Sequence, residues 1–161
     1  MITTLLVDFS RTLLLPKEKT YEGKLNDLYR QITTESGYKF FDFYSLNDEL
    51  LDFLEPLKDK FNLAIYTTEV IQNDPAIKPH LDNIFAQVFT AHDLGTYKRD
   101  PNGYKIISQK LNVSPENILF IDDMPENIEA AKQAGLQTIQ FTTSEEVLKE
   151  LQSKLNLTPT P

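Results

Sequence analysis

Asp8, Thr67 and Asp122 each stand directly after a short run of apolar residues. A carboxylate at the end of a rigid element is suited to nucleophilic attack, and carboxylate oxygens are the ligands that a magnesium ion prefers. The Lys98 ammonium and the Thr67 hydroxyl add donors for the oxygens of a phosphoryl group. Together these residue types predict phosphoryl transfer through a covalent aspartyl phosphate, with a divalent cation taking part.

The runs ahead of these residues have the length and the composition of buried strands. Predicted strands cover, in order along the chain, Ile2–Phe9, Leu63–Tyr66, Gln87–Thr90, Ile118–Ile121 and Thr138–Phe141, and the third has the weakest pattern.

Amphipathic helices are predicted between these strands, since apolar side chains recur there at helical spacing. They comprise residues 21–32 and 50–61, two helices opened by Asp74-Pro75 and Asp100-Pro101, one over 125–134, and one capped by Thr143 with Glu146. This alternation predicts an α/β fold with a doubly wound, Rossmann-like parallel sheet and helices on both faces. Ligands of such sheets bind beyond the carboxyl ends of the strands, so the polar residues there should face one crevice.

A single domain is expected over residues 1–161, because a chain of this length buries one core. Residues 14–45 interrupt the alternation and are predicted to form a small helical insert after the first strand, shorter than a full cap domain. The aromatic run over residues 38–44 could form an apolar lip for substrate or a dimer contact, although packing of the insert onto the core is favoured. The tail Thr158–Pro161 is expected to fray.

Composition restricts the partners of the chain. The net charge of −8 and the pI near 4.7 argue against binding of nucleic-acid phosphates. No run approaches the roughly 18 apolar residues of a membrane helix, and the first strand begins almost at Met1, so we expect no membrane segment, no signal peptide and a cytoplasmic location. Cysteine is absent, which leaves oxygen as the main metal ligand. The expected partner is a small phosphorylated molecule or a phosphopeptide, and the expected assembly is a monomer or a weak homodimer.

Four short motifs, in this order along the chain, resemble those of the haloacid dehalogenase superfamily. They are LLVDFSRT at residues 5–12, LAIYT at 63–67, KRDP at 98–101 and FIDDMPEN at 120–127. The resemblance extends over nearly the whole chain and implies a phosphatase-like, magnesium-dependent hydrolase.

The resemblance also implies roles for individual residues. Asp8 would attack phosphorus, while Thr67 and Lys98 would hold the phosphoryl oxygens, with Thr68 as the competing hydroxyl.

The metal ligands follow from the same resemblance. Magnesium would be held by Asp8, the Ser10 carbonyl and Asp122. Asp123 would lie beside the metal or orient Lys98, and Asn127 would steady the loop by hydrogen bonding.

Ser10 departs from the pattern of the family's phosphatases, which have an aspartate at this position that acts as general acid and base. A serine cannot exchange protons in this way near neutral pH, and loss of such assistance costs about 10²- to 10⁴-fold in rate. Arg11 and Arg99 also replace the usual glycine and proline. They either favour an anionic substrate or are solvated surface side chains.

Three functions therefore remain open: a slow phosphohydrolase acting on phosphomonoesters or acyl phosphates, a catalytically impaired phosphate-binding module, and a 2-haloacid dehalogenase. The dehalogenase is disfavoured because that reaction does not need the paired aspartates. His80 and His92 have no partner at ligand spacing and are interpreted as structural or exposed.

Overall fold

A computed structural model describes residues 1–157, and at its centre is a sheet of five parallel strands. The strands are β1 (Thr4–Val7), β4 (Asn62–Thr67), β5 (Gln87–Thr90), β6 (Ile118–Asp122) and β7 (Gln137–Gln140), in the spatial order β5-β4-β1-β6-β7. The predicted doubly wound parallel sheet is thus confirmed, with all five predicted strands present. The predicted fraying of Thr158–Pro161 concerns residues outside the described range.

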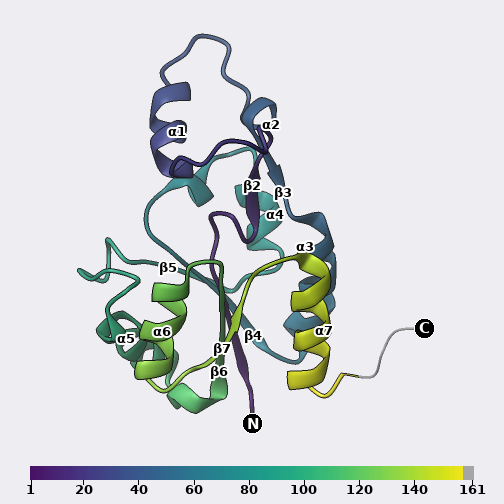
Figure 1. The fold of residues 1–161 in the computed structure, drawn as a ribbon, viewed down its shortest axis with the longest axis vertical. Helices are drawn as coiled ribbons and strands as arrows, with labels where there is room; N and C mark the ends of the chain where they lie inside the picture. The colour runs from purple at the N-terminus through teal and green to yellow at the C-terminus, as the bar shows by residue number, and fades with distance from the viewer. Residues whose placement is uncertain (158–161) are drawn as a thin grey trace.

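Helices cover both faces of the sheet (Figure 1). One face carries α3 (Asp48–Leu54) and α7 (Ser144–Lys154), and the other carries α5 (Pro101–Leu111) and α6 (Pro125–Gln133). Two hydrophobic cores result: the first lies between the sheet and α3 and α7, and the second between the sheet and α5 and α6. Leu5 and Val7 of β1 pack into the first core, and Leu6 packs into the second. All residues of β1 and β6 are buried, which explains why these strands are continuous apolar runs in the sequence.

Two helices begin at the capping residues that were predicted for them. The Asp100 side chain accepts a hydrogen bond from Asn102 N at the start of α5, and the Thr143 side chain accepts one from Glu146 N at the start of α7. The prediction that a helix begins directly after Asp74-Pro75 is wrong, because α4 (Lys78–Asp82) begins three residues after Pro75. Asp74 instead closes a turn by accepting from Ala76 N.

The 50–61 segment also differs from the continuous helix that was predicted. A 3₁₀ helix, η1 (Glu55–Asp59), follows α3 where Pro56 interrupts the α-helical hydrogen bonds. Two further 3₁₀ turns are η2 (Ile71–Asn73) after β4 and η3 (Pro115–Asn117) before β6.

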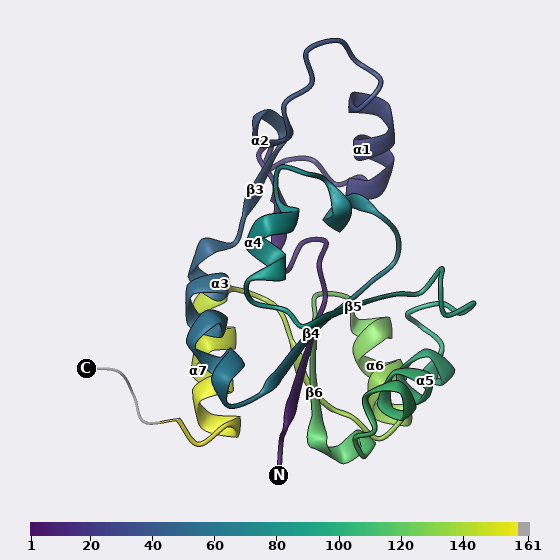
Figure 2. The ribbon, with the colours of Figure 1, turned by 180° about the vertical axis from the view of Figure 1, so that it is seen from behind.

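The insert projects beyond the carboxyl ends of the sheet strands, at the top of Figure 1 and of the reverse view in Figure 2. It contains α1 (Leu25–Ile32) and α2 (Phe40–Phe43), but also a two-stranded antiparallel ribbon of β2 (Leu14–Pro16) and β3 (Tyr44–Leu46) that the sequence did not indicate. Phe40 and Tyr44 are buried in the first core, so the aromatic run packs the insert onto the core, while Phe41 is 42% exposed. No helix within residues 1–157 has the length and hydropathy needed to cross a bilayer.

Candidate active site

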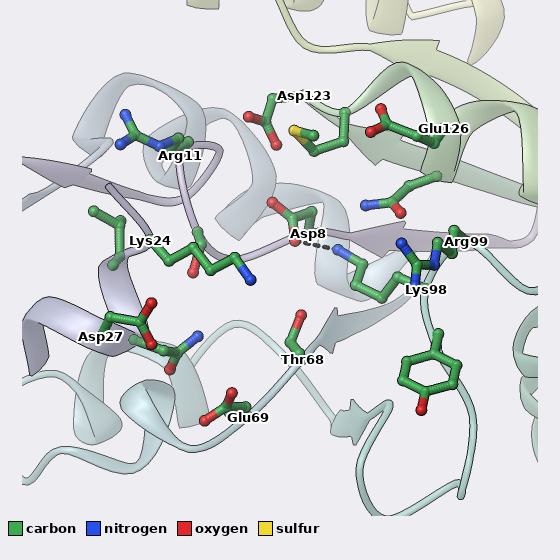
Figure 3. Close-up of a pocket in the computed structure, with 16 residues that line it drawn as sticks. Asp8, Arg11, Lys24, Asp27, Thr68, Glu69, Lys98, Arg99, Asp123 and Glu126 are labelled. Carbon is green, nitrogen blue, oxygen red and sulfur yellow. Dashed lines mark hydrogen bonds and ion pairs between the residues drawn. The ribbon is translucent and has the colours of Figure 1, made fainter. Parts of the chain in front are cut away.

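Asp8 is the first residue after β1, and its side chain is almost completely buried. Its backbone N–H donates to Ile121 O of the neighbouring strand at 2.8 Å, which continues the sheet to this residue. The hydroxyl of Thr12 donates to Asp8 Oδ2 at 3.0 Å, and the Lys98 ammonium forms an ion pair with Oδ1. Both carboxylate oxygens are therefore held by donors, and the side chain points to the carboxyl end of the sheet (Figure 3).

Asp122 ends β6 and is fully buried. Its Oδ1 accepts from Met124 N at 2.8 Å, and both oxygens accept from Asn127 Nδ2 at 3.1 Å. Asn127 was expected to steady the loop by hydrogen bonding. In the structure its side chain contacts the carboxylate of Asp122 directly.

Lys98 joins the two aspartates, since its Nζ also lies 2.6 Å from Asp122 Oδ2. The Tyr104 hydroxyl donates to Lys98 O at 2.6 Å and lies 3.1 Å from Asn127 O, so α5 fixes the backbone that carries the lysine. Burial alone would lower the pKa of Lys98, but the carboxylates of Asp8 and Asp122 raise it above its ordinary value. The lysine therefore stays charged.

Negative charge is in excess around this lysine. One carboxylate oxygen each from Asp8, Asp122 and Asp123 lies within 4.8 Å of the others. Burial raises the pKa of Asp8 in spite of the attraction to Lys98, and Asp122 raises it further. Burial, followed by repulsion from Asp122, raises the pKa of Asp123 to about 6. Three carboxylates against one ammonium form a cluster of hard oxygen donors that a divalent cation would neutralise.

A cavity of about 390 Å³ opens above Asp8 (Figure 3). Ser10, Lys98 and Asp123 line it from the core, and Lys24 and Asn26 line it from the insert. This volume lies within the range of small-molecule sites.

The two threonines after β4 differ in their relation to this cavity. Thr68 lines the cavity, whereas Thr67, the hydroxyl favoured from the motif, is almost fully buried at the end of β4. The structure therefore brings Asp8, Ser10, Thr68, Lys98 and Asp123 to one cavity wall, with Asp122 directly behind.

The two arginines that depart from the motifs make different contacts. Arg11 donates to the carbonyls of Tyr21 and Gly23 at 2.8 and 2.7 Å, so it is a link to the insert rather than a solvated side chain. Arg99 lines the cavity and lies over the ring of Tyr97.

The histidines lie outside the cluster, as interpreted from the sequence. His80 is exposed on α4, and His92 is exposed beside Asp93.

Three contributors were not identified from the sequence. The Thr12 hydroxyl belongs to a recognised motif, but its contact with Asp8 depends on the turn that follows β1. Tyr104 lies in the helix predicted after Asp100-Pro101, and the helical pattern gave it no role at the site. Lys24 stands in a segment without a motif, so no local signal pointed to it.

A family model described as haloacid dehalogenase-like hydrolase matches residues 7–135. The chain belongs to this family. The match begins one residue before Asp8 and ends after α6, so it includes all the residues of the cluster described above.

Curated relatives of this haloacid dehalogenase-like chain include phosphatases. Enolase-phosphatase E1 of Picosynechococcus sp. is 32% identical over 113 residues, which is 66% of this chain and 49% of the relative. Phosphorylated carbohydrates phosphatase of Thermotoga maritima is 29% identical over 91 residues, 56% of this chain and 42% of the relative. The chain thus spans about half or less of the length of these relatives.

Solved structures of the same family share the fold. A predicted HAD-like family hydrolase from Porphyromonas gingivalis superposes with a TM-score of 0.73 at 20% identity, covering 98% of this chain and 100% of that one. A HAD family enzyme from Bacteroides thetaiotaomicron, crystallised with magnesium and inorganic phosphate, gives a TM-score of 0.66 at 15% identity, covering 88% and 95%.

Proposed function

We propose that this chain is a magnesium-dependent phosphohydrolase that transfers a phosphoryl group from a small phosphate ester or acyl phosphate to Asp8 and then to water. The observation that carries the proposal is the Asp8 carboxylate at the floor of the cavity, held by the Thr12 hydroxyl and the Lys98 ammonium. The phosphatase names of the curated relatives support the same reaction class.

The residues around Asp8 suit a magnesium ion, because three carboxylates lie within 4.8 Å of one another and one ammonium does not balance their charge. Asp8, Asp122 and the backbone carbonyl of Ser10 would hold the ion, with Asp123 beside it. A bound magnesium ion supplies Lewis-acid neutralisation of charge on the transferring group.

Phosphoryl transfer then proceeds through the chain's own residues. An oxygen of Asp8 forms a bond to phosphorus as the bond from phosphorus to the ester oxygen breaks. Lys98, together with the hydroxyl of Thr67 or Thr68, binds the non-bridging oxygens, where charge accumulates. Water next attacks phosphorus and releases inorganic phosphate, which restores the Asp8 carboxylate. One water is consumed, and one alcohol (or acid) and one phosphate are formed.

Ser10 limits this reaction. It lines the cavity at the position where the family's phosphatases have the general acid and base, and its buried Oγ has no hydrogen-bond partner among the described residues. The leaving oxygen must then take its proton from water, which restricts rapid turnover to good leaving groups.

The same observation favours a second candidate function, a phosphate-binding module that has lost turnover. Dehalogenation of 2-haloacids is the weaker alternative, because the aspartate cluster beside Asp8 has no part in it.

The test is magnesium-dependent phosphate release from p-nitrophenyl phosphate and acetyl phosphate by wild type, Asp8→Asn and Ser10→Asp. Asp59→Asn is the matched control, since Asp59 is an exposed aspartate in η1. We expect slow wild-type turnover, loss of activity in Asp8→Asn, a gain of about 10²-fold or more in Ser10→Asp, and no change in Asp59→Asn.

Two results would decide against this assignment. Equal activity in wild type and Asp8→Asn would rule out Asp8 as the nucleophile. An inert wild type with an active Ser10→Asp would establish the binding-module alternative.

A further inference from the structure

The insert supplies the part of the cavity wall that lies beyond the carboxyl end of β1. Lys24 and Asn26 line the cavity from the start of α1, while Asp8 lies at its floor. In phosphoryl transfer the leaving group departs roughly in line with the attacking atom and on the opposite side of phosphorus. If Asp8 attacks, as proposed above, the leaving group is directed away from the sheet and towards the insert.

Lys24 presents a positive charge to this space. Its side chain extends from the insert into the cavity, with the ammonium directed towards Asp8 and Thr68 (Figure 3). Within residues 1–157 no carboxylate is close enough to form an ion pair with it. The nearby carboxylates of Asp27 and Glu69 are both engaged by Arg30. An ammonium in this position is therefore available to an anionic group on a ligand.

The backbone at Lys24 is held in place by the loop that follows Asp8. Arg11 donates to the carbonyls of Tyr21 and Gly23, both just ahead of the lysine in the chain, and the Tyr21 hydroxyl donates to Lys24 O at 3.2 Å. Arg11 makes these contacts from a left-handed conformation with φ of 68°, which a side chain disfavours. The contacts therefore maintain a fixed relation between the nucleophile loop and Lys24.

Asn26 adds a second recognition group. The residue lines the cavity, and its Oδ1 is buried without a hydrogen-bond donor among the described residues. A buried acceptor without a donor is costly, and a hydroxyl on a ligand would satisfy it once the Asn26 side chain turns towards the cavity.

We infer that the leaving group of the substrate is a small hydroxy acid, whose carboxylate pairs with Lys24 and whose hydroxyl donates to Asn26. Lys24 is then the residue that selects phosphorylated hydroxy acids over uncharged polyol phosphates. Arg11 is a positioning residue, because it acts through the backbone that leads into Lys24.

The test uses a matched pair of substrates with magnesium: 3-phosphoglycerate, and glycerol 3-phosphate, in which a hydroxymethyl group replaces the carboxylate. The ratio of their kcat/KM values is measured for wild type, Lys24→Gln, Lys24→Arg and Lys19→Gln. Lys19 is the control, being an exposed lysine of the insert that does not line the cavity.

We expect wild type and Lys19→Gln to prefer 3-phosphoglycerate by about tenfold or more, as one charge-assisted contact would give. Lys24→Gln should lose this preference, mainly through KM, and Lys24→Arg should retain part of it. Equal use of both substrates by wild type, or an unchanged ratio in Lys24→Gln, would overturn the inference.

Binding separates this inference from the proposed reaction. Both esters have poor leaving groups, so without a general acid at Ser10 neither need be hydrolysed even if the proposed function holds for p-nitrophenyl phosphate and acetyl phosphate. In that case calorimetric titration with magnesium should still show tighter binding of 3-phosphoglycerate in wild type than in Lys24→Gln. Equal binding in both proteins would contradict the role of Lys24 whether or not turnover occurs.

Arg11→Gly provides a second variant that relieves the left-handed conformation instead of straining the fold. We expect it to keep its melting temperature and to lose part of the preference for 3-phosphoglycerate. If Arg11→Gly prefers 3-phosphoglycerate as strongly as wild type does, Arg11 has no positioning role.

Discussion

Thr4 and Thr12 are both fully buried at the start of the chain, but only one of their hydroxyls has a partner. Thr12 donates to Asp8, whereas Thr4 Oγ1 has no hydrogen-bond partner in the described part of the chain. Thr12→Val leaves one oxygen of a buried carboxylate without a donor, so we expect the free energy of unfolding to fall by about 1–2 kcal/mol. Thr4→Val removes an unsatisfied group and should leave it unchanged or raise it. Urea denaturation of the two variants measures both effects, and equal losses would show that the Asp8 contact adds nothing.

Residue types and their order along the chain were sufficient to predict the cluster of Asp8, Lys98 and Asp122. The two aspartates follow or end buried strands that are clear from hydropathy, and Lys98 stands in the third of the four motifs, just ahead of Asp100-Pro101. The contacts that complete the cluster were not predictable in this way. The Thr12 hydroxyl donates to Asp8 from a turn in which Arg11 adopts a left-handed conformation, and the Arg11 side chain contacts carbonyls more than nine residues away. A motif records which residues are present, but not which backbone turn brings them together.

One carboxylate outside the insert accepts two hydrogen bonds from it. Asp74, in the turn between η2 and α4, accepts from the Tyr29 hydroxyl at 2.9 Å and the Tyr38 hydroxyl at 3.1 Å. Burial, together with the contact to Asp74, raises the pKa of Tyr29 to about 12, so this hydroxyl remains a donor at neutral pH. The double variant Tyr29→Phe/Tyr38→Phe leaves Asp74 short of donors.

We expect this double variant to weaken the attachment of the insert by about 2 kcal/mol, since hydrogen bonds to charged groups contribute at the upper end of the usual range. Hydrogen exchange should accelerate in α1, while protection in β4 and β6 changes little. Tyr97→Phe is the control, because Tyr97 is 69% exposed. Faster exchange spread evenly over the sheet would indicate general destabilisation instead of release of the insert.

The elements of the sheet were predictable because hydropathy determines them locally, and those of the insert were not. β1 and β6 are buried on both faces and therefore give continuous apolar runs. β2 and β3 are three residues long and pair across about 30 residues of chain, so neither has a periodic pattern of its own. The start of α4 was misplaced because Asp74 has the residue type of a helix cap, yet its carboxylate is used by a turn and by the insert.

The whole molecule carries a net charge of −8, and the aspartate cluster concentrates part of this charge in the interior. In the metal-free protein, burial raises the pKa of Asp8 and raises that of Asp123 to about 6, while the carboxyls of an unfolded chain have pKa values of about 4. Between these values the folded state binds more protons than the unfolded state. The contribution of the cluster to stability is therefore greatest at acidic pH and is lost as the pH rises through the folded-state pKa values.

Magnesium should reverse this dependence, because it takes the place of the protons on the same carboxylates. We expect the increase in melting temperature on adding magnesium to be small at pH 5 and larger at pH 8, by about 2–4 °C for each kcal/mol of added stability. Sodium chloride at matched ionic strength is the control, since screening of a net charge of −8 acts on the whole surface and does not require the cluster. An equal magnesium effect at both pH values would mean that the ion binds elsewhere, and Asp8→Asn would then leave that effect unchanged.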